Sequence, residues 1–173
     1  MTKTRVFADT NVILEAYRTD CWPAIIRHFA IETVQKCVEE TLTGNPSNPR
    51  HIAISPERLY SGLAARHPVT GRELASLVLE YPSCGTLDDG EKHLLAWLLA
   101  NKLFPSDIIV VTTADKAALV AIGSLNWLEF AVSLEYLARQ AGVARKNLKK
   151  LAMQYREDWL SSIKTQISLK VIP

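Results

Sequence analysis

Short apolar runs recur along the chain and predict the strands of a buried sheet. "RVFA" at 5–8 and "DIIVVTT" at 107–113 are almost continuously apolar, and the second run is rich in β-branched residues. Continuous rather than alternating apolarity is typical of strands that are buried on both faces of a parallel sheet. "FAIE" at 29–32 is a further candidate strand, and "FAVSLEYL" at 130–137 begins with strand-like residues before its pattern becomes helical.

Helix start signals lie between these apolar runs. "TGRE" at 70–73 has the spacing of a capping box, and "DDGE" at 88–91 has the same spacing in front of the apolar "KHLLAWLLA". "SP" at 55–56 places proline in the first turn of a helix that is expected to continue to about Ala65, and "NPSNPR" at 45–50 predicts a loop. Strands that alternate with helices predict an α/β fold with three layers, α/β/α, around a central parallel sheet.

The pattern changes from about residue 145 onwards. Apolar residues recur near helical spacing over about 145–168, and lysine and arginine residues lie between them. This combination predicts a C-terminal helical extension that packs on the core by one apolar stripe and exposes a basic face. The apolar positions are Leu148, Leu151, Tyr155 and Trp159, and the basic positions are Arg145, Lys146, Lys149, Lys150 and Arg156.

Length and composition favour one cytoplasmic domain. The 173 residues suffice for a single domain, with a core over about 4–140 followed by the extension. No run approaches the length of a membrane span and no signal sequence stands at the N-terminus, so no membrane contact is expected. Three cysteines without a C-x-x-C pair support neither a zinc ribbon nor a disulfide framework. The net charge of +2 is too small to indicate a nucleic-acid partner, although basic surfaces can be local.

Four acidic residues stand at places that can share one edge of the predicted sheet. Asp9 directly follows "RVFA", and Asp115 follows "IIVVTT" with only Ala114 between them. Glu40 and Glu91 lie in predicted helices. Ligands of open α/β sheets bind beyond the carboxyl ends of the strands. Taken singly, each acid is also explained as a helix cap, a capping-box residue or a solvated side chain. Taken together, the four indicate a shared site.

A shared acidic site requires a cation. Two carboxylates about 4 Å apart repel by about 4 kcal/mol at an effective dielectric constant of 20, so four could not stay ionised together unaided. Ligand sets of oxygen alone, without histidine or cysteine, select hard ions. We therefore expect Mg²⁺ or Mn²⁺ at this site.

The same acids lie in motifs that resemble those of the PIN domain, a fold of metal-dependent nucleases that includes bacterial toxin ribonucleases. "VFADTNVIL" is similar to its opening strand with the first acidic ligand, Asp9. "VEETLTG" resembles its second motif, in which an acid precedes glycine by four residues, so Gly44 selects Glu40 over Glu39. "LDDGEKHLLAWLLA" and "VVTTADKAAL" are similar to the third and fourth motifs, and the resemblance covers about residues 4–140.

The resemblance implies a central parallel sheet of about four or five strands and an acidic pocket that holds one or two divalent ions. The implied catalytic and metal-binding residues are Asp9, Glu40, Glu91 and Asp115. Asn11 and Thr113 are expected to hydrogen-bond the ligating carboxylates, unless their side chains bond only within their own turns. The third acid lies within a "DDGE" cluster, so Asp88 or Asp89 can replace or assist Glu91.

The activity that the resemblance implies is hydrolysis of phosphodiester bonds in RNA, with DNA left open as a substrate. Basic residues at the rim of the pocket are expected to hold the nucleic-acid backbone. Lys116 is the first candidate because it adjoins Asp115. Further candidates are Arg18, Arg50, Arg58, Arg66 and Arg72, together with the basic residues of the extension.

The resemblance also leaves the biological role open. A toxin with an antitoxin-like protein partner and a homodimer are both compatible with it, although the extension is longer than compact toxin members carry. A catalytically silent PIN-like module, which acts as a scaffold for a protein or RNA partner, is an alternative to the nuclease. An enzyme that acts on small phosphate esters usually has an acid two residues after its aspartate nucleophile, and Asn11 at that position disfavours this function.

Overall fold

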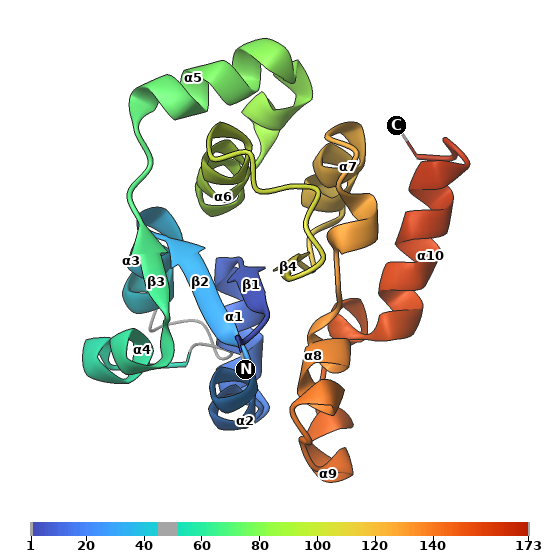
Figure 1. Ribbon diagram of the computed structural model, residues 1–173. Coiled ribbons are helices and arrows are strands. Elements are labelled where there is room, and N and C mark those ends of the chain that lie inside the picture. The colour runs from blue at the N-terminus through green and yellow to red at the C-terminus, as the bar shows by residue number, and fades with distance from the viewer. Residues whose placement is uncertain (1, 45–51, 173) are drawn as a thin grey trace.

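A central parallel sheet organises the computed structural model, which describes residues 2–44 and 52–172. Among these residues, four parallel strands pair in the order β3-β2-β1-β4 (Figure 1). The strands are β1 (Arg5–Ala8), β2 (Ala30–Val34), β3 (Ala65–His67) and β4 (Ile109–Thr112). Three of them confirm predicted strands, whereas β3 has no counterpart in the predicted set. The run at 130–137 contributes only one parallel bridge, between Ala131 and Val111.

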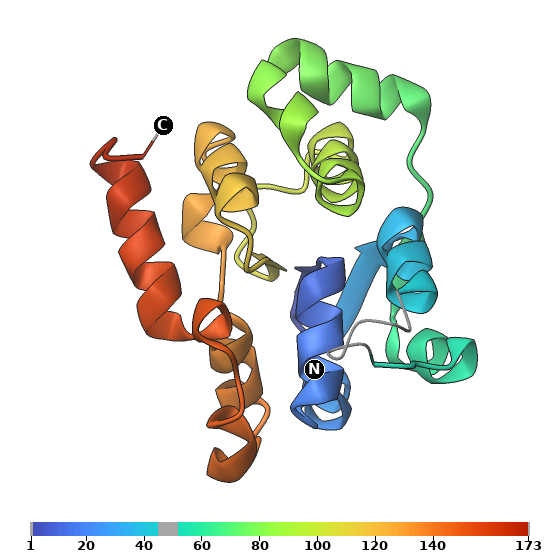
Figure 2. The same ribbon diagram turned by 180° about the vertical axis from the view of Figure 1, so that it is seen from behind.

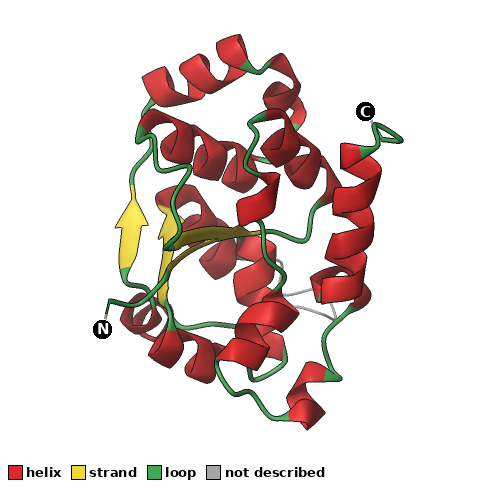
Figure 3. Ribbon diagram, turned by 45° about the vertical axis from the view of Figure 1, so that its right-hand side comes forward, coloured by secondary structure: helices red, strands yellow, loops and turns green. Residues whose placement is uncertain are grey.

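Helices cover both faces of the sheet, which confirms the predicted three-layer α/β/α architecture (Figures 1, 2 and 3). The α-helices are α1 (Thr10–Arg18), α2 (Trp22–His28), α3 (Gln35–Thr43), α4 (Pro56–Gly62), α5 (Gly71–Glu80), α6 (Asp89–Ala100), α7 (Lys116–Ser124), α8 (Leu134–Gln140), α9 (Arg145–Leu148) and α10 (Glu157–Ser168). The short 3₁₀ helices are η1 (Pro82–Thr86), η2 (Leu128–Phe130) and η3 (Met153–Tyr155).

Successive side chains of β1 enter two separate apolar clusters, as the alternation of a strand requires. Phe7 packs with residues of α5, α6 and α7 on one face of the sheet. Val6 and Ala8 pack with residues of α1, α2 and α8 on the other face. β1 is therefore buried on both sides, which is why its sequence is continuously apolar.

Two of the three predicted helix starts are confirmed. Thr70 and Glu73 form a complete capping box at the start of α5, in which each backbone N–H donates to the other residue's side chain. Ser55 caps α4, but the helix ends at Gly62 rather than near Ala65, because the chain has become β3 by then. The loop predicted at 45–50 lies outside the described residues.

The "DDGE" spacing does not form a capping box, and this prediction was wrong. Asp88 occupies the N-cap position of α6, but its side chain makes no capping hydrogen bond. Glu91, the third residue of α6, is buried rather than turned back to the start of the helix. The spacing therefore places Glu91 in a buried position and does not cap the helix.

The C-terminal extension is helical at both ends but is not one continuous helix. Residues 149–152, between α9 and η3, leave the helical path, and α10 then runs alongside α7 (Figures 1 and 2). Leu151 and Tyr155 are buried with α1 and α8, whereas Leu160 and Ile163 join the cluster on the other face. Of the predicted stripe, Leu148, Leu151 and Tyr155 therefore pack with the cluster of α1 and α8, and Trp159 packs partly against the cluster on the other face.

The cysteines and the lengths of the helices bear on the predictions from composition. All three cysteines, Cys21, Cys37 and Cys84, are buried and unpaired. Within residues 2–44 and 52–172, none of the helices combines the length and the apolarity that a bilayer crossing needs.

Candidate functional site

The sheet brings Asp9 and Asp115 to one edge, as predicted. β1 and β4 are parallel neighbours with Ala8 opposite Thr112, so both strands end at the same level. The Asp9 N–H donates a hydrogen bond to the carbonyl of Thr112 (3.3 Å). The connections from β1 lead to β2 and β3 on one side, whereas β4 lies on the other side. The two acids therefore stand at the point where the strand order reverses, the usual ligand position in open α/β sheets.

Asp9 is both a helix cap and a carboxylate with an unused oxygen. Its Oδ1 accepts a hydrogen bond from the N–H of Val12 (2.8 Å), which caps α1. Its Oδ2 is buried and has no hydrogen-bond partner among the described residues. The side chain is only 1% exposed. Capping and ligand binding are thus not alternatives for Asp9, because each uses a different oxygen.

Burial raises the pKa of the Asp9 carboxyl to about 6. The hydroxyl of Thr113 and the N–H of Val12 oppose this shift, while the nearby carboxylates of Asp115 and Glu40 add to it. A buried carboxylate that feels two like charges gains most from a bound cation.

Glu40 is held in place by contacts with two other elements. The Thr10 hydroxyl of α1 donates to Oε2 of Glu40 (2.6 Å), and the N–H of Gly90 in α6 donates to Oε1 (3.0 Å). A Cβ atom at position 90 would overlap this carboxylate and also crowd the Sγ of Cys37. The glycine of "DDGE" therefore allows α6 to approach α3, and Glu39 lies exposed on the same helix.

Glu91 is the most strongly perturbed acid of the site. It is 7% exposed, and its carboxylate makes no hydrogen bond to the described part of the chain. Burial raises the pKa of Glu91 to about 8, and repulsion from Asp115, Asp9, Asp88 and Glu40 adds to the rise. Glu91 therefore holds a proton near neutral pH unless a cation neutralises the site.

Asp115 caps the next helix and is partly exposed. It accepts a hydrogen bond from the N–H of Ala118 (2.9 Å), and its own N–H donates to the hydroxyl of Thr113 (3.1 Å). Thr113 is therefore bonded within its own turn while it also lowers the pKa of Asp9. Asp115 raises the pKa values of Asp9 and Glu91, so its charge reaches both.

Three of the four predicted acids line one pocket of about 480 Å³. This pocket, the acidic pocket below, is bordered by Asp9, Thr10, Asn11, Lys36, Glu40 and Glu91, with Leu87, Asp88 and Asp89 completing it. Asp115 borders a neighbouring pocket of about 530 Å³ that shares Leu87 with the acidic pocket. The predicted acids thus gather at one edge of the sheet, with Asp115 at its border.

The two alternate acids, Asp88 and Asp89, lie at the rim of the acidic pocket and are exposed. Asp89 forms ion pairs with Lys36 (3.7 Å) and Lys92 (3.6 Å), so its charge is already partly neutralised. Asp88 has no capping bond and adds to the repulsion at Glu91. Of the "DDGE" acids, Glu91 is therefore the one buried in the site.

Sequence reasoning missed Thr10, Gly90 and Lys36. Asn11 borders the acidic pocket but is exposed, and it makes no hydrogen bond to a site carboxylate within the described residues. Thr10, one residue earlier, supplies that contact instead, to Glu40. Thr10 and Asn11 follow the same strand with equal local signals, so only the distant partner Glu40 distinguishes them.

Three of the predicted rim arginines, Arg18, Arg58 and Arg66, make contacts elsewhere. Arg18 is bonded to the buried carboxylate of Glu15 (2.6 Å), and Arg58 lies over the ring of Tyr17 (5.6 Å). Lys116 is exposed beside the acidic site and borders the neighbouring pocket. Arg50 lies outside the described residues. Arg66 lies over the ring of Tyr60 and Arg72 is exposed at the start of α5.

The donor chemistry suits a hard cation, but the ligands are not assembled. No group of three or more acidic, histidine or cysteine side chains in residues 2–44 and 52–172 is close enough to hold a metal ion. The unpartnered oxygen of Asp9 and the unbonded carboxylate of Glu91 are oxygen donors of the kind Mg²⁺ and Mn²⁺ prefer.

No protein-family model matches the sequence, and no curated protein matches it. The resemblance to the PIN domain therefore stays a prediction.

Proposed function

We propose that this protein is a divalent-metal-dependent nuclease of PIN-like fold, and specifically a ribonuclease that hydrolyses phosphodiester bonds. The observation that carries the proposal is the buried, unpartnered Oδ2 of Asp9 beside Glu40 and Glu91 in one pocket. Buried polar atoms are nearly always hydrogen-bonded. The Thr113 hydroxyl lowers the pKa of Asp9 but does not reach hydrogen-bond geometry with Oδ2, so this oxygen stays open to a further partner.

Electrostatics supports a cation as that partner. The pKa values of Asp9 and Glu91 are raised to about 6 and about 8 by burial and by mutual repulsion. A divalent ion is a large local charge and reverses both effects, because it stabilises the ionised form of each carboxylate. Perturbed carboxyl groups in a cleft are common at functional sites.

Each residue of the site has a distinct task in this proposal. Asp9, Glu91 and Asp115 would hold Mg²⁺ or Mn²⁺, which supplies a water of lowered pKa and neutralises charge on the reacting phosphate. Both oxygens of Glu40 are occupied by donors from Thr10 and Gly90, so Glu40 keeps a fixed position at the wall of the pocket. A carboxylate fixed in this way can orient an attacking water and accept its proton.

The proposal also covers the cellular compartment and the binding partners. Three unpaired cysteines fit a reducing compartment, and we place the protein in the cytoplasm. RNA is the proposed partner, and DNA is the alternative substrate. A toxin role, an antitoxin-like protein partner and a homodimer rest on the resemblance alone.

Cleavage of labelled RNA with Mn²⁺ or Mg²⁺ tests the proposal. We expect cleavage by the wild-type chain and none by the Asp9→Asn/Asp115→Asn double variant, because both carboxylates would bind the ion. Glu39→Gln is the matched control, since Glu39 is an exposed neighbour of Glu40, and it should cleave like the wild type. Cleavage that survives in the double variant would contradict the assigned site, and cleavage of DNA alone would change the substrate.

One observation favours the alternative function, a catalytically silent binding module. The site acids do not converge on one point, and Glu40 is already satisfied by internal donors. Under this alternative, RNA or a protein binds without being cut, and Mn²⁺ causes no saturable heat in calorimetry.

A further inference from the structure

A second pocket lies between α1 and the C-terminal extension, next to the acidic pocket. It has a volume of about 470 Å³, and the residues that matter here are Asn11, Arg18, Lys150, Gln154 and Tyr155. Asn11 borders both pockets, so they open on either side of the first turn of α1. We call this second pocket the extension pocket.

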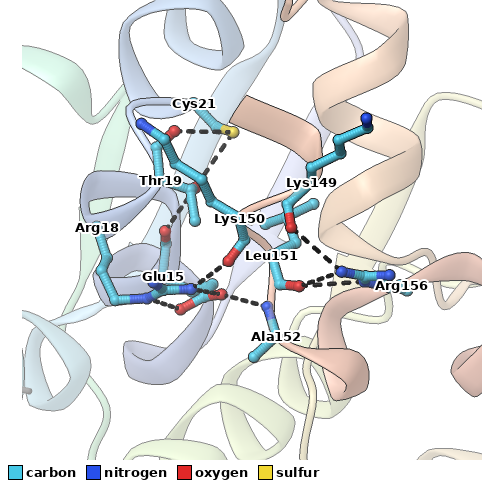
Figure 4. Close-up of polar contacts among 9 residues, drawn as sticks. All are labelled: Glu15, Arg18, Thr19, Cys21, Lys149, Lys150, Leu151, Ala152 and Arg156. Carbon is cyan, nitrogen blue, oxygen red and sulfur yellow. Dashed lines mark hydrogen bonds and ion pairs between the residues drawn. The ribbon is translucent and has the colours of Figure 1, made fainter. Parts of the chain in front are cut away.

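The extension pocket has a built wall, because the C-terminal segment is fastened to α1 (Figure 4). The buried carboxylate of Glu15 accepts hydrogen bonds from the Arg18 guanidinium (2.6 Å) and from the N–H of Ala152 (2.8 Å). Arg18 also donates to the carbonyl of Lys150 (2.7 Å). These contacts join two segments that are more than a hundred residues apart in the sequence, which fixes where the extension lies.

A further set of bonds shapes the extension itself. The Arg156 guanidinium donates to the carbonyls of Leu151 (2.9 Å) and Lys149 (3.3 Å), which turns the chain between α9 and α10 (Figure 4). Arg156 is therefore engaged internally, while Lys150 borders the extension pocket. Among the basic residues of the extension, Lys150 is the one that borders this pocket within the described residues.

The charges of the two pockets are complementary. The acidic pocket repels a polyanion, so a nucleic-acid strand needs cations on the protein beside it. Within the described residues, the Lys150 ammonium is paired only with the exposed Asp20 (3.1 Å), and an exposed pair of this kind is easily exchanged for a phosphate. Lys150 is thus a cation at the extension pocket whose partner a bound phosphate can replace.

Tyr155 supplies an uncharged donor on the same wall. Burial raises the pKa of its hydroxyl above the ordinary value, and the carboxylates of Asp9 and Glu15 raise it further. The hydroxyl therefore keeps its proton, and Tyr155 borders the extension pocket. A phenol hydroxyl at this pocket can donate to a sugar or phosphate oxygen, while its ring stays packed in the core.

We propose that the extension pocket binds the nucleotide of a single-stranded RNA next to the phosphate in the acidic pocket, with Lys150 on its phosphate and Tyr155 on its sugar. This inference rests on the proposed function for the identity of the strand. A pocket of this size takes one unstacked nucleotide, which a duplex does not present. The extension thereby becomes part of the substrate-binding surface.

Binding of a fluorescein-labelled oligouridine, followed by anisotropy in EDTA, tests the inference without any cleavage. Lys150→Ala should weaken binding several-fold and lower the slope of log Kd against log salt by about one, as expected for one phosphate contact. The bonds of Lys150 to Arg18 use its backbone carbonyl, so the variant keeps the fastening of the extension. Lys149→Ala is the matched control, because Lys149 is the exposed neighbour whose carbonyl also accepts an arginine.

Tyr155→Phe gives a second, independent reading. It keeps the buried ring and removes the hydroxyl, so it should weaken binding of oligouridine more than binding of oligodeoxyuridine, if the contact is to the 2′-hydroxyl. An unchanged preference for RNA over DNA would place the tyrosine contact elsewhere and overturn that part of the inference.

The outcomes separate this inference from the proposed function. Weaker binding by Lys150→Ala, in a protein that cuts no nucleic acid, would support the extension pocket and contradict the nuclease. Equal binding by the Lys150→Ala and Lys149→Ala variants would overturn the extension pocket, whether or not the wild type cleaves RNA. Absence of oligouridine binding by the wild type would also overturn it.

Discussion

Replacing Glu91 by glutamine should stabilise the protein when divalent ions are absent. The pKa of the Glu91 carboxyl rises from 4.5 to about 8 in the folded chain, first through burial and then through repulsion from Asp115 and Asp9. An acid with a raised pKa loses stability as the pH rises from its unfolded value to its folded value. The penalty at Glu91 therefore grows between about pH 4.5 and about pH 8, and it is complete above that range. Glutamine has the same shape and does not ionise.

The size of the effect follows from the pKa shift. One pKa unit corresponds to about 1.4 kcal/mol, and the rise at Glu91 sets an upper limit of about 5 kcal/mol. The acidic pocket opens to solvent, which screens the repulsion. We therefore expect Glu91→Gln to raise the free energy of unfolding by about 2 kcal/mol above pH 8, and by much less near pH 4.5.

Urea denaturation in EDTA across this pH range measures the difference directly. Glu39→Gln serves as the control, since Glu39 is exposed and lies outside the acidic pocket. Addition of Mn²⁺ should stabilise the wild type and reduce or reverse the advantage of Glu91→Gln. A stability difference that does not grow with pH would refute the account of Glu91 as a carboxyl destabilised by burial and by its acidic neighbours.

Three further substitutions test contacts around the site. Gly90→Ala pushes a methyl group against the carboxylate of Glu40, so it should lower the free energy of unfolding by about 1–3 kcal/mol, measured in urea. Gly85→Ala is the control, because its methyl group meets only ordinary contact and should leave the free energy of unfolding nearly unchanged. Thr10→Val removes a donor to that carboxylate and should lower the RNA cleavage rate several-fold; an unchanged rate would show that this bond does not support catalysis. Glu15→Gln should weaken the fastening of the extension by about 1–2 kcal/mol, seen as faster hydrogen exchange in the segment after α9, and unchanged exchange would contradict that role.

The elements of the fold that could be predicted are those with a local signal. β1 and β4 are buried on both faces, and this environment requires the continuous apolar runs that the sequence shows. β3 carried no such signal, because its three residues are only partly buried or exposed and lie at the edge of the sheet. The apolar spacing predicts a helical extension over about 145–168, but it does not reveal the break between α9 and η3, where the hydrogen bonds of Arg156 turn the chain.

The site residues that could be predicted are likewise those with a local sequence signal. Asp9 and Asp115 follow buried strands, so their place at the sheet edge could be inferred from the chain alone. The contact of Glu40 with Thr10 and with the N–H of Gly90 could not, because it joins three helices through tertiary packing. The same applies to Lys36, whose partner Asp89 lies on another helix.

Titration with Mn²⁺ in a calorimeter tests the central claim most directly, because the claim is that the carboxylates at this sheet edge hold a cation. The wild type should show saturable binding, and binding should tighten as the pH rises through about 8, since the ion must displace the proton of Glu91. The Asp9→Asn variant should lose this binding. Saturable binding of equal strength in wild type and Asp9→Asn, or no binding in the wild type, would contradict the account.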